Sequence, residues 1–213
     1  MAAFSASKIN MRDASALISD DEFKVVHELL ARNNPLVATF FQTAFYTGMR
    51  FNEIFGLSID DIFIGELDDN VLRQALEDHK IEYFGYIILE SQPGTKIRNR
   101  LPDKTIKRKP LKGKPKISEK FNRLVPIINK ELFNNLVKLY KIQEVKFKQK
   151  IYGSNPKDYV LFETLTSSEA AVDLRNAYAK TTYAPKSYHC CRHTRELVPN
   201  LGGICQWTFG LIV

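Results

Sequence analysis

The chain has 213 residues, of which 44% are hydrophobic and 26% charged. This length and composition predict one globular domain with a substantial core and exclude a low-complexity or fibrous protein. The three cysteines, two of them adjacent at Cys190 and Cys191, cannot form a fully paired disulfide framework, so we expect a reducing, cytoplasmic setting. No segment suits a secretory leader, and the uncharged residues 197–213 are too short and interrupted to span a membrane.

Positive charge is concentrated in one part of the sequence. The formal net charge is +7, but 13 of the 31 basic residues and only two of the 24 acidic residues lie between Lys96 and Lys130. A basic segment in an otherwise slightly acidic chain predicts a localised polyanionic partner, with nucleic acid favoured over an anionic membrane. Disorder of residues 95–115 is the alternative interpretation.

Helices are expected after an N-terminal arm that covers residues 1–18. Ser19 is a good N-cap, the acidic residues that follow it suit the helix dipole, and Pro35 prevents this helix from continuing. The apolar run over residues 36–46 predicts a buried helix that ends at Gly48. Its aromatic residues could instead stack on nucleic-acid bases, but their helical spacing favours the core.

Two strands are expected on either side of the basic segment. Residues 83–89 and 123–127 are rich in aromatic and β-branched residues, and Pro126 suits an edge position, so they predict a small antiparallel sheet with a basic hairpin. Ile142 belongs to the apolar stripe of a long helix. The remaining helices are expected at residues 51–57, at 129–151 and from Thr166 to about 179. The predicted fold class is α+β, mainly α-helical.

Two separated pieces of sequence place an arginine beside a possible partner. In TGMRFNEIFGLSIDDI, Arg50 opens a helix and can fork toward a phosphate, while Glu53 braces it or a neighbouring arginine. A surface ion pair between these two residues is the alternative. In YHCCRHT, a helical conformation would put His189 and Arg192 on one face, where they either converge on one anion or form a structural pair.

Together with the hairpin that ends in RLVPI, these pieces resemble the tyrosine recombinase (phage integrase) family over residues 19–194. TGMRFNEIFGLSIDDI is similar to the family's first-arginine box, YHCCRHT to its His-x-x-Arg-His-Thr box, and the hairpin to the strand pair that presents a lysine. The three motifs occur in the family's order. The resemblance implies an incomplete recombinase catalytic domain over residues 19–196, followed by an atypical tail over 197–213. It implies a bacterial or phage-encoded protein that acts on double-stranded DNA without a cofactor or metal.

The resemblance also implies roles for single residues. Arg50 and Arg192 would clamp the scissile phosphate and stabilise the charge of the transition state. His189 would donate a hydrogen bond to the same phosphate and carry a proton, and Glu53 would orient its neighbours.

The hairpin would supply the general acid and much of the DNA contact. Lys112, with Lys116 as the alternative, would protonate the departing 5′-oxygen. The contacts with DNA phosphates would be strongly salt-dependent. The basic residues expected to make them are Lys107, Arg108, Lys109 and Lys114.

One part of the family pattern is missing. The family chemistry needs a tyrosine nucleophile roughly thirty residues after the second arginine. The 21 residues after Arg192 contain no tyrosine, and Trp207 lies too close to Arg192 to match the box that precedes it. We therefore expect no covalent strand cleavage, whether the chain is a fragment, a frameshifted product or a non-catalytic DNA-binding relic. Family members form tetramers on DNA through C-terminal segments. We expect this chain to lack such a segment and therefore to be a monomer in solution.

Two other functions are disfavoured. An RNA-binding protein would carry a recognisable RNA motif, and this sequence has none. A zinc site is disfavoured because the sequence has no C-x₂-C pair and adjacent cysteines point in different directions. Its ligands would have to come from His189, Cys190, Cys191, His193 and Cys205.

Overall fold

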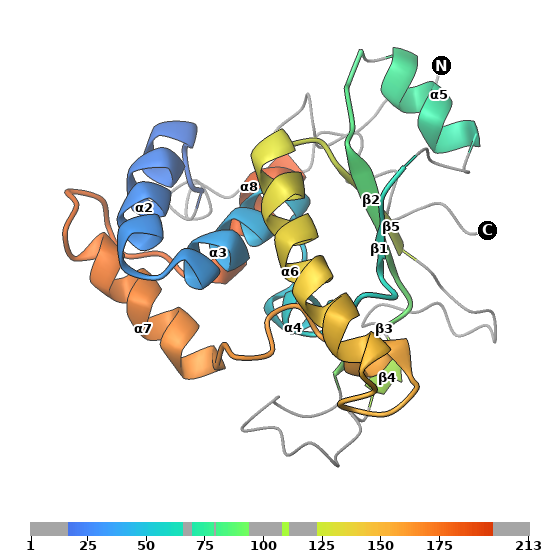
Figure 1. The fold of residues 1–213 in the computed structure, drawn as a ribbon. Coiled ribbons are helices and arrows are strands. Elements are labelled where there is room, and N and C mark those ends of the chain that lie inside the picture. The colour runs from blue at the N-terminus through green and yellow to red at the C-terminus, as the bar shows by residue number, and fades with distance from the viewer. Residues whose placement is uncertain (1–16, 66–69, 79, 94–107, 111–122, 198–213) are drawn as a thin grey trace.

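Helices dominate the computed structural model, which describes residues 17–65, 70–78, 80–93, 108–110 and 123–197 (Figure 1). A small antiparallel sheet lies beside them, so the predicted α+β class, mainly helical, is confirmed. The helices are α2 (Asp20–Asn33), α3 (Pro35–Thr47), α4 (Phe51–Phe55), α5 (Asn70–Asp78), α6 (Lys130–Lys148), the 3₁₀ turn η1 (Pro156–Asp158), α7 (Ser167–Tyr178) and α8 (Tyr188–Leu197). The strands are β1 (Ile62–Phe63), β2 (Gly85–Leu89), β3 (Ser91–Pro93), β4 (Arg108–Pro110) and β5 (Arg123–Ile127).

Capping residues set the boundaries of the first two helices. The Ser19 hydroxyl accepts a hydrogen bond from the backbone N–H of Glu22 at 3.1 Å, which caps α2. Pro35 occupies the first turn of α3, where its missing N–H costs nothing. At the other end Gly48 adopts φ 62°, a left-handed conformation that glycine adopts without strain. The predicted ends of both helices are confirmed.

The packed part of the chain starts before α2. Ile18, which the sequence places in the N-terminal arm, is buried in the core, and its backbone N–H donates to Thr194 Oγ1 at 2.9 Å. An apolar side chain at this position gains more by burial in the core than by remaining in water. The rest of the predicted arm, residues 1–16, lies outside the described residues.

The main sheet has the strand order β1-β2-β5 and is antiparallel. Gly85 in β2 is required for space, because a Cβ there would lie 2.6 Å from the carbonyl oxygen of Phe63. Pro126 lies on the edge strand β5, as predicted, where its missing N–H breaks no ladder. Strands β3 and β4 form a separate ladder that continues the connection after β2.

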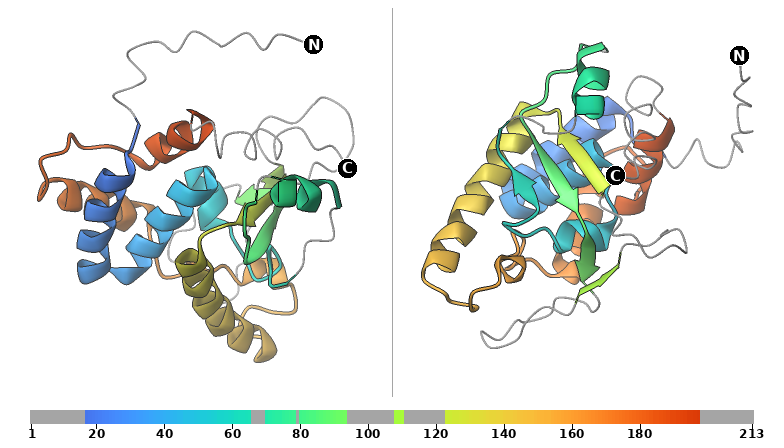
Figure 2. Two further views of the ribbon diagram at one scale, coloured as in Figure 1. Left: turned by 90° about the horizontal axis from the view of Figure 1, so that it is seen from above. Right: turned by 90° about the vertical axis from the view of Figure 1, so that its right-hand side faces the viewer.

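The two faces of the sheet pack against different helices. Helices α3 and α6 cover one face, and α5 lies toward the other (Figure 2). Ile87 and Leu89 of β2 point into the main core, while the alternate residue Tyr86 packs with Leu76 of α5. Period-two alternation therefore gives the sheet two apolar faces, each with its own cover.

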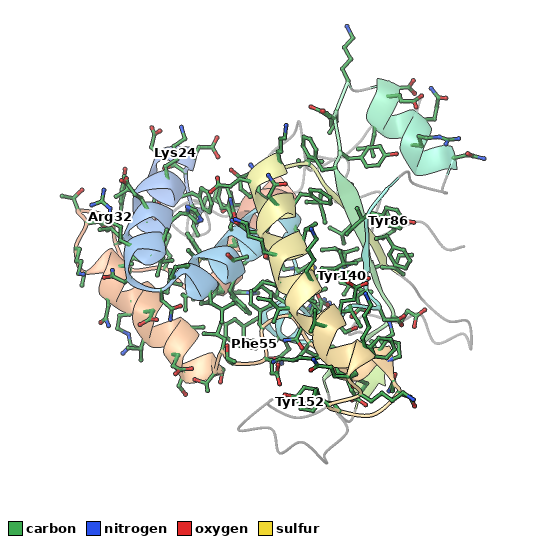
Figure 3. All side chains as sticks on the ribbon, in the orientation of Figure 1. Lys24, Arg32, Phe55, Tyr86, Tyr140 and Tyr152 are labelled. Atoms are coloured by element: carbon green, nitrogen blue, oxygen red, sulfur yellow. The ribbon has the colours of Figure 1, made fainter. Side chains whose placement is uncertain are left out.

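An aromatic cluster joins the helices in the middle of the molecule. The ring of Phe40, from α3, lies 4.6–5.1 Å from the rings of its four neighbours. These neighbours are Phe51 and Phe55 of α4, Phe162, and Tyr188 of α8. Figure 3 shows Phe55 among the buried side chains. The aromatic residues of α3 thus belong to the core, as preferred over base stacking, and they hold α4 near α8.

None of the helices within the described ranges is both long enough and apolar enough to cross a bilayer.

We predict that Phe40→Ala lowers the free energy of unfolding by about 4 kcal/mol, because it removes a large buried ring and leaves a cavity. Urea denaturation followed by circular dichroism measures this loss. Val172→Ala, which trims a side chain that is 46% exposed, is the control and is expected to cost under about 1 kcal/mol. Equal losses in the two variants would contradict the central position of Phe40.

Candidate anion-binding site

A cavity of about 360 Å³ opens where α4, α8 and β3 meet. Arg50 lies 142 residues before Arg192 in the chain, yet both border the same space. None of the lining residues within the described part of the chain carries a carboxylate. The lining is formed by Met49, Arg50, Phe51, Asn52, Gln92, Tyr188, His189 and Arg192.

Arg50 is fixed at the start of α4 by the carboxylate of Glu53. Its backbone is extended, with φ −68° and ψ 147°, so Arg50 is the N-cap of this short helix. Glu53 Oε2 accepts from the backbone N–H of Arg50 at 2.8 Å, and Glu53 Oε1 accepts from Arg50 Nη1 at 3.0 Å. One carboxylate therefore holds both the main chain and the guanidinium of Arg50. The Arg50 side chain is 31% exposed, so it is fixed on the protein side while it borders the cavity.

The same carboxylate forms a second ion pair, with Arg123. Arg123 Nη2 donates to Glu53 Oε2 at 2.6 Å, and the two side chains are 4% and 0% exposed. Burial by itself raises the pKa of Glu53, but the charge of Arg123 and hydrogen bonds from Arg50 and Arg123 outweigh it. The pKa of Glu53 is therefore held below its ordinary value of 4.5, and the group is ionised at neutral pH.

Arg123 lies close enough to Arg50 and Arg192 for their charges to affect its pKa. Burial lowers the pKa of Arg123, Glu53 opposes this effect, and the positive charges of Arg192 and Arg50 add to the lowering. Arginine stays protonated in proteins, so Arg50 and Arg192 each bring a positive charge to the cavity. Two positive charges beside a described lining without carboxylates favour an anionic ligand.

Helix α8 brings the second motif to the cavity. The segment is helical from Tyr188, so His189 and Arg192 lie on one face, as the spacing predicts, and both line the cavity. The Thr194 hydroxyl donates to the carbonyl oxygen of Cys190 at 3.0 Å and accepts from Ile18 N–H, which joins α8 to the start of the chain.

Tyr188 lines the cavity with its ring, but its hydroxyl group is used elsewhere. This hydroxyl donates to the carbonyl oxygen of Ala170 in α7 at 3.1 Å, and the residue is buried. Burial, with smaller contributions from Cys191 and Asp173, raises the pKa of Tyr188 well above its ordinary value. A buried, hydrogen-bonded phenol that resists ionisation is a poor nucleophile.

The structure places the residues predicted from sequence in three groups. Arg50, His189 and Arg192 border one cavity, and Glu53 lies behind Arg50. Lys109 lies in β4. The predicted residues Lys107, Lys112, Lys114 and Lys116 lie outside the described residues.

Arg108 has a structural role that the sequence did not indicate. Its Nη2 donates to the carbonyl oxygens of Gly56 at 2.9 Å and Lys157 at 2.8 Å, and Nη1 lies 3.4 Å from the Ser91 hydroxyl. The guanidinium thus ties β4 to the end of α4. Contact of Arg108 with DNA stays a prediction, and these bonds to the protein's own backbone already engage two of its nitrogens.

Three residues near the cavity were missed by sequence reasoning. Asn52 and Gln92, which carry amide side chains, line the cavity, and Arg123 holds Glu53. Arg123 begins the RLVPI segment and could have been noticed there, because an arginine at the start of a buried strand needs a carboxylate partner. Neither amide is marked by any local pattern.

Across the described ranges, no group of three or more His, Cys, Asp or Glu side chains is arranged to hold a metal ion. Comparisons with protein families, curated proteins and solved structures find no match to this chain.

We predict that Glu53→Gln lowers the free energy of unfolding by about 3 kcal/mol at pH 7, because it removes the carboxylate charge that pairs with the buried Arg123 guanidinium. The pKa of Glu53 is lowered by folding, so its ionised form stabilises the folded state above the ordinary pKa of 4.5. This contribution disappears as the pH falls through the folded-state pKa.

Urea denaturation of both proteins from pH 7 down to pH 2 measures the effect. The two unfolding free energies should converge at the acid end, since protonated Glu53 resembles glutamine. Glu28→Gln, which alters an exposed carboxylate paired with Arg32, should change stability by under about 1 kcal/mol. A difference between wild type and Glu53→Gln that stays constant with pH would contradict the assignment.

Proposed function

We propose that the cavity binds a phosphate group of double-stranded DNA and that the chain has the fold and the function of the tyrosine recombinase catalytic domain. In that family the function is site-specific DNA recombination or integration; this chain would not cleave DNA, because its sequence carries no tyrosine after Arg192 to serve as the nucleophile. The observation that carries the proposal is the meeting of Arg50, His189 and Arg192 at one cavity, among whose described lining residues none has a carboxylate. These residues come from the two motifs that resemble the family, and a phosphodiester is the anion that two arginines and a histidine would hold.

The chemistry follows from the groups around the cavity. Arg50 and Arg192 would bind the two non-bridging oxygens of a phosphodiester, and their charge would stabilise the additional negative charge of the transition state. His189 would donate a hydrogen bond to the same group and exchange a proton with it. Glu53 does not line the cavity, and its role would be to orient Arg50. Protonation of the leaving 5′-oxygen would fall to Lys112 or Lys116.

A second candidate function, DNA binding without strand cleavage, is favoured by the position of Tyr188. It is the one tyrosine among the described residues that line the cavity, and its hydroxyl is committed to Ala170. Phosphotyrosyl chemistry needs a hydroxyl in line with the phosphorus atom. The described cavity lining does not supply one, so binding can occur at this site without covalent chemistry.

The remaining parts of the proposal concern partners and location. The basic segment between Lys96 and Lys130 would follow the DNA backbone next to the cavity, through contacts with phosphates. The protein would be a cytoplasmic, DNA-associated monomer in solution, whereas members of the family assemble as tetramers on DNA.

We predict that Arg50→Ala and Arg192→Ala each weaken binding of a short DNA duplex by about tenfold, because each removes a charge-assisted hydrogen bond to phosphate. Fluorescence anisotropy at several salt concentrations measures the affinity and its salt dependence. Arg32→Ala is the matched control, because Arg32 is an exposed arginine on the outside of α2 (Figure 3). Equal affinities for wild type, Arg50→Ala and Arg192→Ala would overturn the proposed phosphate site.

The two candidate functions differ in covalent chemistry. We predict that incubation with a nicked suicide DNA duplex gives no protein–DNA band on a denaturing gel, because no tyrosine hydroxyl in the described cavity lining is available to the phosphate. A covalent band would favour strand cleavage over binding alone. The Tyr188→Phe variant shows whether Tyr188 forms such a band, since a band that persists in this variant comes from another tyrosine.

A further inference from the structure

The proposed phosphate site contains a third arginine that does not line the cavity. Arg123 begins β5 and pairs across the sheet with Leu89 of β2, so its backbone is fixed by the central ladder. Its side chain is 4% exposed and reaches Glu53 Oε2 at 2.6 Å. The buried Arg123 guanidinium therefore makes the shortest of the described hydrogen bonds to Glu53.

The hydrogen bonds around Glu53 connect Arg123 to Arg50. Glu53 Oε2 accepts from Arg123 Nη2 and from the backbone N–H of Arg50, while Oε1 accepts from Arg50 Nη1. Both carboxylate oxygens are thus engaged, and the plane of the carboxylate is fixed. Helix α4 has only five residues, so it cannot by itself hold the guanidinium of Arg50 in one orientation.

We infer that Arg123 is a positioning residue, which acts through Glu53 to hold Arg50 in the orientation that binds phosphate. This inference rests on the proposed function, since it concerns the ligand of the same cavity. Without Arg123, Glu53 has one arginine in place of two and can turn toward Arg50, which would draw that guanidinium away from the ligand. The contribution of Arg50 to DNA binding should then depend on Arg123.

A purely structural role for Arg123 makes a different prediction. If Arg123 only stabilised the fold, its removal would lower stability and leave the effect of Arg50→Ala on affinity unchanged, because independent effects add. The coupling between the two residues is therefore the readout, and a loss of stability alone does not decide the question.

The test is a double-mutant cycle on the full chain with a short fluorescein-labelled DNA duplex as the probe. In wild type, Arg50→Ala should weaken binding by about tenfold. In the Arg123→Met background the same substitution should weaken it by less than about threefold, because Arg50 is no longer held in place. Arg123→Lys keeps a cation near Glu53 and should restore part of the Arg50→Ala effect. An equal factor in the wild-type and Arg123→Met backgrounds would overturn the inference.

The same measurements distinguish failure of the proposed phosphate site from failure of the positioning role of Arg123. If Arg50→Ala leaves the affinity of wild type unchanged, the cavity is not the phosphate site, and the inference falls with it. If Arg50→Ala weakens wild type but the factor is the same without Arg123, the phosphate site stands and only the positioning role is lost.

Two further backgrounds test for loss of folding and for nonspecific effects. Arg123→Met removes a positive charge that offsets the buried charge of Glu53, so this variant can fail to fold. In that case the double variant Glu53→Gln/Arg123→Met, which has neither charge, replaces it, and Arg50→Ala should again weaken DNA binding by less than about threefold. A tenfold factor in that background would refute the inference. Lys146→Met removes the cation from another mostly buried carboxylate, Glu163, at a separate place in the fold. In this background the Arg50→Ala factor should equal that of wild type.

Discussion

Glu53 is a fully buried carboxylate, and its charge requires the arginines that surround it. A carboxylate loses its hydration when it is buried, and this cost is offset only by close cations and hydrogen bonds. Arg50 and Arg123 provide them from α4 and β5, two elements 70 residues apart in the chain. The ion pairs therefore tie the helical part of the molecule to its sheet. They also explain why positive charge gathers next to the cavity, because the arginines needed near Glu53 lie beside it.

The aromatic core has a complementary role, since it brings the second motif to the same place. Phe40 packs against Phe51 of α4 and Tyr188 of α8. Phe51 immediately follows Arg50 in the chain, and Tyr188 immediately precedes His189. Packing of apolar rings thus determines the separation of the polar side chains that line the cavity. A change in this core would move Arg50 relative to Arg192 without altering either residue.

Much of this arrangement could be predicted from local patterns. Ser19, Gly48 and Thr166 marked helix ends correctly, because capping depends on residues within one turn. Periodicity was less reliable in α6. Ile142 was predicted in its apolar stripe but is 55% exposed, whereas the adjacent Gln143 is buried and donates to Glu163 at 2.9 Å. A step of one residue turns a helix by about 100°, so a polar residue with a tertiary partner can take the inward position.

Contacts between residues far apart in the chain could not be predicted from the sequence. The motifs pointed to Arg50, Glu53, His189 and Arg192, but no spacing rule indicates that Arg123 lies against Glu53 or that Gln92 lines the same cavity. Helix α5 was also missed. Its residues pack on the far face of the sheet, and that packing, more than local preference, stabilises a helix of nine residues.

The central claim is that Arg50 and Arg192 bind a DNA phosphate together, while Arg123 remains with Glu53. It is tested most directly by nuclear magnetic resonance of the arginine Nε–Hε groups, assigned with Arg→Lys variants, during titration with a short DNA duplex. The Arg50 and Arg192 signals should shift together with one dissociation constant, while the Arg123 signal should stay in place and protected from solvent exchange. Duplex binding that leaves the Arg50 and Arg192 signals unmoved would contradict it.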